Sequence, residues 1–282
     1  MIKKILLTFL LIILSCSFSP DFSNESSNYS SLFIITEDIE IGENRVGFAL
    51  VDQEGLSIIE NVNFFYKKID NKNSKNIKPT NITKWPNNTN VFITYLDFES
   101  EGYWEIYAEH GGTLTKAVIE VKKESNTLSV GSYIDRIKTP SLTGNKIEDI
   151  STDLKPDLDF YTYTLAEALE ENKPILLSFS TPGLCVTATC APQLDELKLI
   201  KDNNKDNLIV IHVEVWKNFK EIMSKGDLSI GIVNESVEKF GINTEPWTFL
   251  INKNGLVVNR YQGYVSSIEI EKDLLSINVR DQ

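Results

Sequence analysis

Positive charge is scarce in this sequence. Lys and Arg number 28 against 40 Asp and Glu, which gives a formal net charge of −12 and a pI near 4.8. Binding to nucleic-acid phosphates depends on clustered Lys and Arg side chains. The composition therefore argues against direct binding to nucleic acid or to an anionic membrane surface.

The N-terminus has an apolar run, but it is too short to span a bilayer. Lys3 and Lys4 precede an almost wholly apolar stretch over residues 5–14. A membrane-spanning helix needs about 20 such residues. Two basic residues followed by a short apolar run are instead typical of a secretory signal peptide.

Cysteine is also scarce, with three residues in the chain: Cys16, Cys185 and Cys190. The residues Ile13-Leu14-Ser15-Cys16 resemble the lipobox of bacterial lipoproteins. This resemblance implies a signal peptide over 1–15, a lipidated Cys16 and a lipid-anchored, extracytoplasmic protein of the bacterial cell envelope. Residues 16–31 then form a flexible tether. The alternative is ordinary signal cleavage with an incidental cysteine.

Lipidation of Cys16 leaves one pair of cysteines, Cys185 and Cys190. The secretory route delivers this pair to an oxidising compartment. Two isolated cysteines in such a compartment tend to be bridged or to cycle between states.

Residues 32–123 carry the pattern of an all-β domain. Short strands are expected at 32–36, 45–51, 61–68, 91–96, 103–109 and 115–121. Their spacing, alternation and lack of helical period predict an immunoglobulin-like β-sandwich. Gly111 and Gly112 mark a hairpin, His110 is expected at a surface turn, and residues 70–90 at a long polar loop. No catalytic constellation is present in this domain.

Residues 124–159 lack a sustained period and are expected to form an interdomain linker. The C-terminal region, 160–282, alternates between helical and strand patterns. Helices are expected at 164–171, 191–201, 234–240 and 266–275, and strands at 175–179, 208–215, 247–251 and 256–261. This order predicts a mixed α/β sheet covered on both faces. Thr164 and Glu167 have the spacing of a capping box at the start of the first helix.

The C-terminal pattern resembles the thioredoxin fold over about residues 160–275. The cysteines follow the first buried strand, Glu245-Pro246 precedes the penultimate strand and Gln262-Gly263 follows the last. The resemblance implies a thiol–disulfide oxidoreductase that acts on protein thiols or disulfides, without a cofactor or metal. It also implies that Pro246 is a cis-proline that helps bind the substrate chain, and Glu245 is a candidate nearby base.

The cysteine spacing departs from the usual two intervening residues, because four residues separate Cys185 and Cys190. In one helix, residues five apart differ by about 7.5 Å in rise and about 140° in direction, whereas a disulfide needs Cα atoms within about 7 Å. If the two cysteines pair, Cys185 must lie in the turn and Cys190 in the first helical turn. An N-cap at Thr189 makes Pro192 the third helical residue, while a start at Thr187 places it deeper.

This arrangement assigns different roles to the two thiols. Cys190 at the positive end of a helix has a stabilised thiolate. Cys185 in the turn is the better candidate for attack on a substrate disulfide, and Cys190 then resolves the mixed disulfide. Two further departures are the absence of tryptophan before Cys185 and the presence of Ser178 where many family members have a buried acid.

Three other interpretations remain open. The disulfide could be structural and never cycle. Alternatively, Cys185 and Cys190 resemble the paired cysteines of the Sco copper-chaperone family, whose spacing is three; His212 would be a poor third ligand because it lies in an apolar strand and is expected to pack in the core. Finally, the segment around Thr181 loosely resembles a peroxiredoxin loop, with its spacing off by one.

Overall fold

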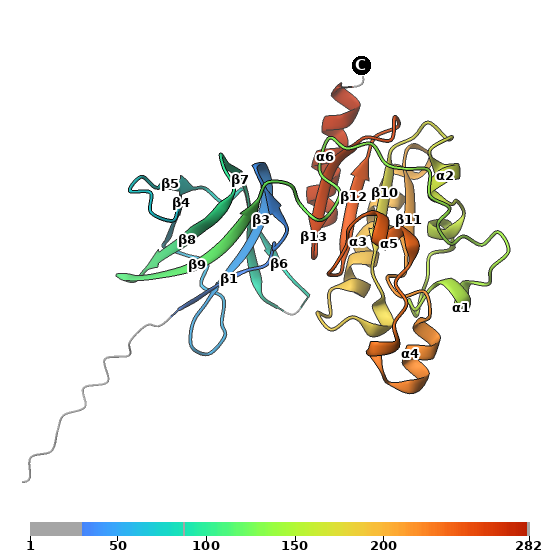
Figure 1. Ribbon diagram of the computed structural model, residues 1–282, viewed down its shortest axis with the longest axis horizontal. Helices are drawn as coiled ribbons and strands as arrows, with labels where there is room; N and C mark the ends of the chain where they lie inside the picture. Colours follow the sequence, from blue (N-terminus) through green and yellow to red (C-terminus); the bar gives the residue numbers. More distant parts are fainter. Residues whose placement is uncertain (1–29, 87, 281–282) are drawn as a thin grey trace, which may run out of the picture.

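The computed structural model describes residues 30–86 and 88–280. A β-sandwich and an α/β domain lie beside each other along the long axis of the molecule (Figure 1). The predicted signal peptide and Cys16 lie outside the described residues. None of the helices in the described part of the chain has the length and apolar character needed to cross a membrane.

The first domain consists of two packed sheets, as predicted. One sheet has the strand order β1 (Ser31–Ile34), β3 (Gly42–Val51), β7 (Asn90–Phe98), β6 (Asn81–Lys84). The other has the order β2 (Ile39–Glu40), β9 (Thr113–Lys122), β8 (Gly102–His110), β4 (Val62–Lys68), β5 (Lys75–Ile77). All pairs are antiparallel except the short pair β2–β9. The result is a β-sandwich consistent with the immunoglobulin-like class.

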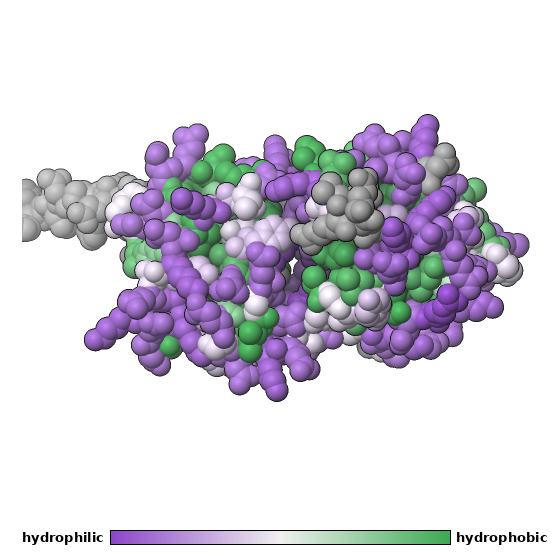
Figure 2. All heavy atoms as spheres, turned by 90° about the horizontal axis from the view of Figure 1, so that it is seen from above, coloured by the Kyte–Doolittle hydropathy of each residue, from purple (hydrophilic) through white to green (hydrophobic). Residues whose placement is uncertain are grey.

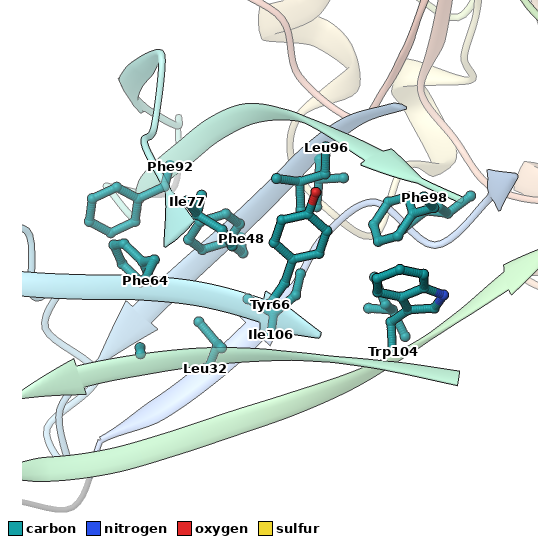
Figure 3. Packing of buried hydrophobic residues seen from close by; sticks show 14 of the residues in the cluster. Leu32, Phe48, Phe64, Tyr66, Ile77, Phe92, Leu96, Phe98, Trp104 and Ile106 are labelled. Atoms are coloured by element: carbon teal, nitrogen blue, oxygen red, sulfur yellow. The ribbon is translucent and has the colours of Figure 1, made fainter. Parts of the chain in front are cut away.

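Aromatic side chains from both sheets form the core of the sandwich (Figure 3). The rings of Phe48 and Phe92 on one sheet lie 4.9 and 4.7 Å from the ring of Phe64 on the other, each with edge-on geometry. Such pairs stabilise the domain beyond the area that they bury. The inward positions are those that the alternating pattern of the strands predicted.

The expected polar loop at 70–90 is wrong, because it contains the two edge strands β5 and β6. Each of these strands pairs with a neighbour on one side only. Few of their side chains are buried: Ile77 is buried, but Ile82 is 44% exposed. A mostly solvated edge strand does not need the apolar alternation by which strands are identified in a sequence.

The second domain is built on a four-stranded sheet of order β11 (Ile209–Val213), β10 (Ile175–Phe179), β12 (Trp247–Ile251), β13 (Val257–Gln262). The pair β10–β11 is parallel, and the other two pairs are antiparallel. Every residue of β10, β11 and β12 is buried. These strands are therefore covered on both faces, which explains their continuous apolar sequence.

Helices α3 (Cys190–Asn204) and α6 (Ser267–Arg280) pack in the core on one face of this sheet, and α2 (Leu165–Ala168) and α5 (Glu235–Lys239) in the core on the other (Figure 1). The predicted capping box of α2 is present, with Thr164 and Glu167 bonded reciprocally. Helix α4 (Phe219–Lys225) was not predicted. It buries only Phe219 and Ile222, too few for a clear helical period.

The segment 124–159 packs against the α/β domain and includes the short helix α1 (Ile147–Ile150). Gly131 N donates to Val257 O at 2.8 Å, and Val257 N donates to Ser132 O at 2.9 Å. Ile137 and Ile150 are buried in the cores on the two faces of the sheet. This segment is therefore part of the packing of the second domain.

Buried polar contacts join the two domains. Arg45 of the sandwich forms a bidentate ion pair with Glu269 of α6, at 2.6 and 2.9 Å. Arg260 of β13 donates to Asp38 O of the sandwich at 3.3 Å, and within the second domain to Thr127 O at 2.9 Å. A cavity of about 560 Å³ remains between the domains, and a hollow is visible there from above (Figure 2).

Candidate functional site

The structure joins Cys185 and Cys190 by a disulfide, with an S–S distance of 2.07 Å and a Cα–Cα distance of 6.2 Å. Cys185 directly follows a 3-10 turn, Pro182–Leu184, that leaves the end of β10, and Cys190 is the first residue of α3. This is the turn-and-helix placement that the spacing requires if the two cysteines are bridged.

The two sulfurs differ in their access to solvent. Cys190 is completely buried, whereas Cys185 is half-buried. The adjacent Val186 is 92% exposed, so this part of the loop projects into solvent. An incoming thiol or disulfide therefore has access to the sulfur of Cys185 rather than that of Cys190.

Threonines shape the loop between the cysteines. The hydroxyl of Thr187 lies 3.3 Å from Cys185 Sγ and 2.8 Å from Thr189 Oγ1. Thr189 precedes α3 but makes no side-chain capping bond to the helix. The start of this helix is electrically positive, which favours negative charge on the sulfur of Cys190.

The carboxyl group of Glu245 faces the disulfide from the neighbouring loop. Its Oε2 lies 4.0 Å from Cys190 Sγ and accepts a hydrogen bond from Thr181 N. Burial raises the pKa of Glu245 to about 7, although the bond from Thr181 opposes the shift. The next peptide bond, Glu245–Pro246, is cis. A carboxyl group 55 positions away from Cys190 in the sequence thus lies beside its sulfur.

A second carboxyl group at this site, that of Glu214, was not singled out from the sequence. Glu214 follows the last residue of β11 and is 3% exposed. Burial raises its pKa to about 8, hydrogen bonds from Thr152 and Thr181 oppose the shift, and the charge of Glu245 adds to it. The sequence did contain a signal for this residue, because Glu214 stands at the end of an apolar run that forms β11. Since β11 is parallel to β10, the residues that follow the two strands lie at the same edge of the sheet.

Ser178 and His212 are buried in the sheet. Ser178 Oγ donates to Trp247 O at 3.4 Å. This position therefore carries a hydroxyl group in place of the buried acidic side chain of many thioredoxin-like proteins. Both ring nitrogens of His212 have polar neighbours, with Nδ1 2.7 Å from Tyr161 Oη and Nε2 3.0 Å from Ser180 Oγ. Burial lowers the pKa of His212 to about 4. His212 is the packed core histidine that the sequence predicted.

Within residues 30–86 and 88–280, no group of three or more His, Cys, Asp or Glu side chains is arranged to hold a metal ion. The large cavity between the domains is lined by Arg45, Tyr95, Arg260 and Asp273 among others, and neither cysteine lines it. The disulfide and its two carboxyl groups therefore form a site separate from this cavity.

Comparison with known proteins identifies the second domain. A family model for a thioredoxin-like domain matches residues 161–277. This match confirms the thioredoxin-like character of the C-terminal domain that the sequence predicted. No match to a curated protein was found.

Several solved structures have weak similarity to this chain. StoA from Bacillus subtilis is 18% identical, with 36% of this chain and 82% of that chain covered and a TM-score of 0.28. A DsbF homologue from Corynebacterium diphtheriae is 16% identical, with 51% and 91% covered and a TM-score of 0.32. A chain of the Titin M10–Obscurin like 1 Ig complex is 8% identical, with 33% and 94% covered and a TM-score of 0.19.

Proposed function

We propose that the thioredoxin-like domain is a thiol–disulfide oxidoreductase that acts through Cys185 and Cys190 on protein thiols or disulfides. One observation carries this proposal: the buried sulfur of the disulfide lies 4.0 Å from a carboxyl oxygen of Glu245. Burial raises the pKa of this carboxyl group to about 7. A group of this kind can accept and return a thiol proton near neutral pH.

The reduced protein would attack through Cys185, whose sulfur is the accessible one. Its thiolate forms a bond to one sulfur of a substrate disulfide, and the other substrate sulfur leaves as a thiolate. This step produces a mixed disulfide between Cys185 and the substrate. The substrate chain would lie along Glu245 and Pro246, as the thioredoxin resemblance implies.

Cys190 would then resolve the mixed disulfide. Its thiol gives a proton to the carboxylate of Glu245, and the resulting thiolate attacks Sγ of Cys185. The Cys185–Cys190 bond forms as the bond between Cys185 and the substrate breaks, and the substrate leaves as a thiolate. At the end, the cysteine pair of the protein is oxidised to a disulfide and the substrate disulfide is reduced to two thiols. The same steps in reverse would oxidise a substrate dithiol.

The reduction potential tests the proposal against the alternative of a structural disulfide. The full chain is equilibrated with mixtures of reduced and oxidised dithiothreitol, and its free thiols are counted by alkylation and mass spectrometry. We expect a potential above about −300 mV, in the range of cycling disulfides. A lower value identifies a structural bridge and removes the redox function.

Trapping tests the assignment of the two roles. Cys190→Ser should react through Cys185 with a disulfide-containing peptide and keep the resulting mixed disulfide, because the resolving thiol is missing. Cys185→Ser should form little adduct, because the sulfur of Cys190 is buried. A stable adduct on Cys190 in the second variant would reverse the roles.

We further propose that the protein acts outside the cytoplasm and is anchored through a lipid on Cys16. The lipobox-like residues that end at Cys16 support this proposal. In a bacterial host, the full chain should fractionate with membranes and Cys16→Ser should not. Equal membrane association of both proteins would contradict lipid anchoring without affecting the redox proposal.

A further inference from the structure

The buried carboxyl group of Glu214 and the partly buried one of Glu245 lie on either side of Thr181 beneath the cysteine turn. On the basis of the proposed redox function, we propose that they act as a coupled pair that shares one proton across Thr181. In this arrangement Glu245 contacts the sulfur, and Glu214 is a positioning residue that acts through Glu245 and through the turn before Cys185.

Thr181 contacts the carboxyl group of Glu245 and the backbone next to Glu214. Its backbone N–H donates to Glu245 Oε2. Its Oγ1 accepts a hydrogen bond at 3.0 Å from the backbone N–H of Val215, the residue that follows Glu214. Thr181 is completely buried, so solvent screens the two carboxyl groups from each other only weakly at this point.

Glu214 also holds the turn that leads to Cys185. Its Oε1 accepts hydrogen bonds from Thr152 N at 2.6 Å and from Thr152 Oγ1 at 3.0 Å. Oγ1 of Thr152 in turn accepts from Gly183 N at 2.9 Å. The position of the accessible cysteine thus depends on Glu214 through Thr152 and through Thr181.

No cation compensates the pair. Among residues 30–86 and 88–280, no Lys or Arg ion pair with Glu214 or Glu245 is present, and His212 on the same strand is neutral because burial lowers its pKa to about 4. The nearby phenol is that of Tyr161, which is neutral because burial raises its pKa. Lys198 on α3 forms an ion pair with Asp153, at 3.1 Å.

A buried carboxylate and a partly buried one without a cation repel each other, so loss of the second proton is disfavoured. The pair therefore holds one proton over a range of pH in which separate glutamates would hold none. When Cys190 gives its proton to Glu245, the ionisation of Glu214 determines how strongly Glu245 accepts it. Removal of the charge at Glu214 should therefore alter proton transfer without touching either sulfur.

Carboxyl NMR of the oxidised full chain tests the pair without any redox turnover. With 13C-labelled glutamate side chains, Glu214 and Glu245 should titrate in two coupled steps above pH 6, and Glu214→Gln should leave a single step at Glu245. The matched control is Glu238→Gln, which removes an exposed carboxylate of α5. Titration of Glu214 and Glu245 as independent groups near the ordinary pKa of about 4.3 would overturn the proposal.

Single-turnover kinetics then connect the pair to the reaction. The rate at which Cys190 resolves a mixed disulfide with a glutathionylated peptide should follow two titrations in the native protein and one in Glu214→Gln. At pH 9 the variant should be about threefold slower, because Glu245 is then the weaker base. Glu214→Asp, which keeps the charge, should restore the two-step profile.

An unchanged pH profile in an active, folded Glu214→Gln variant would overturn the role of Glu214 and leave the oxidoreductase intact. Absence of all exchange in the native protein would instead remove the redox function. In that case Glu214 and Glu245 could still titrate as a coupled pair in the NMR experiment, because that coupling depends on the fold and not on redox turnover. The two failures are therefore distinguishable.

Discussion

Gln262 Nε2 donates a hydrogen bond to Thr244 Oγ1 at 3.0 Å, directly before the loop residue Glu245. The Oε1 atom of the same side chain accepts from Glu37 N at 2.8 Å and from Asp38 N at 3.2 Å, in the sandwich. One amide thus connects the first domain to the loop that carries Glu245, whose carboxyl group lies beside the disulfide. The sandwich is not simply a spacer at this contact, because it helps to fix that loop.

Replacement of Gln262 by alanine should therefore affect both stability and reactivity. The side chain is 7% exposed, and its loss leaves the backbone donors of Glu37 and Asp38 without their acceptor. We expect a loss of about 2 kcal/mol in the free energy of unfolding, measured by urea denaturation. Resolution of the mixed disulfide should also become slower. The control Asn145→Ala removes an exposed amide with one local bond and should change stability by less than about 0.5 kcal/mol.

The ion pair between Arg45 and Glu269 should contribute strongly to docking of the domains. Its side chains are 4% and 10% exposed, and removal of one partner leaves a buried charge. Arg45→Met should therefore lower the free energy of unfolding by about 3–5 kcal/mol. Arg136→Met breaks an exposed pair, with side chains 62% and 63% exposed, and should lower it by less than about 1 kcal/mol. Equal effects of the two variants would contradict a stabilising role for the buried pair.

His212 should make the protein less stable in acid. The folded pKa is about 4 against an ordinary value of 6.5, because burial disfavours the charged ring. Between these values the unfolded chain binds more protons than the folded one, so stability falls as pH decreases from about 6.5 to 4. Urea denaturation at pH 7, 5.5 and 4 should show this loss, and the loss should be smaller in His212→Gln. Parallel curves for both proteins would show that His212 does not titrate in this way.

Glu214 should have the opposite effect in the alkaline direction. Burial raises its folded pKa to about 8 from an ordinary value of 4.5. The folded protein then binds more protons between these values, so this group's contribution to stability is lost as pH rises from 4.5 through 8. The side chain of the Glu214→Gln variant cannot ionise, so the variant does not lose this contribution as the pH rises. From pH 6 to pH 9, the difference in free energy of unfolding should therefore shift in favour of the variant by on the order of 1 kcal/mol or more. A constant difference across this range would contradict a raised pKa.

Two glycines test the packing of the segment 124–159 on the second domain. Gly241 and Gly226 both follow a helix with left-handed backbone, at φ +67° and +63°. A Cβ atom at Gly241 would lie 1.9 Å from the carbonyl oxygen of Asn126, whereas one at Gly226 would have nothing within 4 Å. Gly226→Ala should lower the free energy of unfolding by about 1 kcal/mol, and Gly241→Ala by more than about 3 kcal/mol because the backbone must move. Similar losses would show that Asn126 is not packed there.

Local sequence was sufficient for much of the architecture. The continuous apolar run at β12 gives the strand Trp247–Ile251 at its predicted bounds, and Thr164 and Glu167 form the predicted capping box. A continuous apolar run identifies a strand that is buried on both faces, and the capping box joins two residues three positions apart, so both can be recognised from a short stretch of sequence. The edge strands β5 and β6 were missed because a strand with one partner and a solvated face has little apolar pattern.

The sequence by itself determined the two-domain layout, the thioredoxin-like character of the second domain and the geometry that a bridge between Cys185 and Cys190 would require. Bond lengths and helical rise are enough for that last inference. Only the tertiary structure placed Glu214 and Glu245 on either side of Thr181, and Gln262 between the sandwich and Thr244. These contacts join residues 18 to 225 positions apart. They depend on strand register and on domain docking, and no local pattern of apolar and polar residues encodes either one.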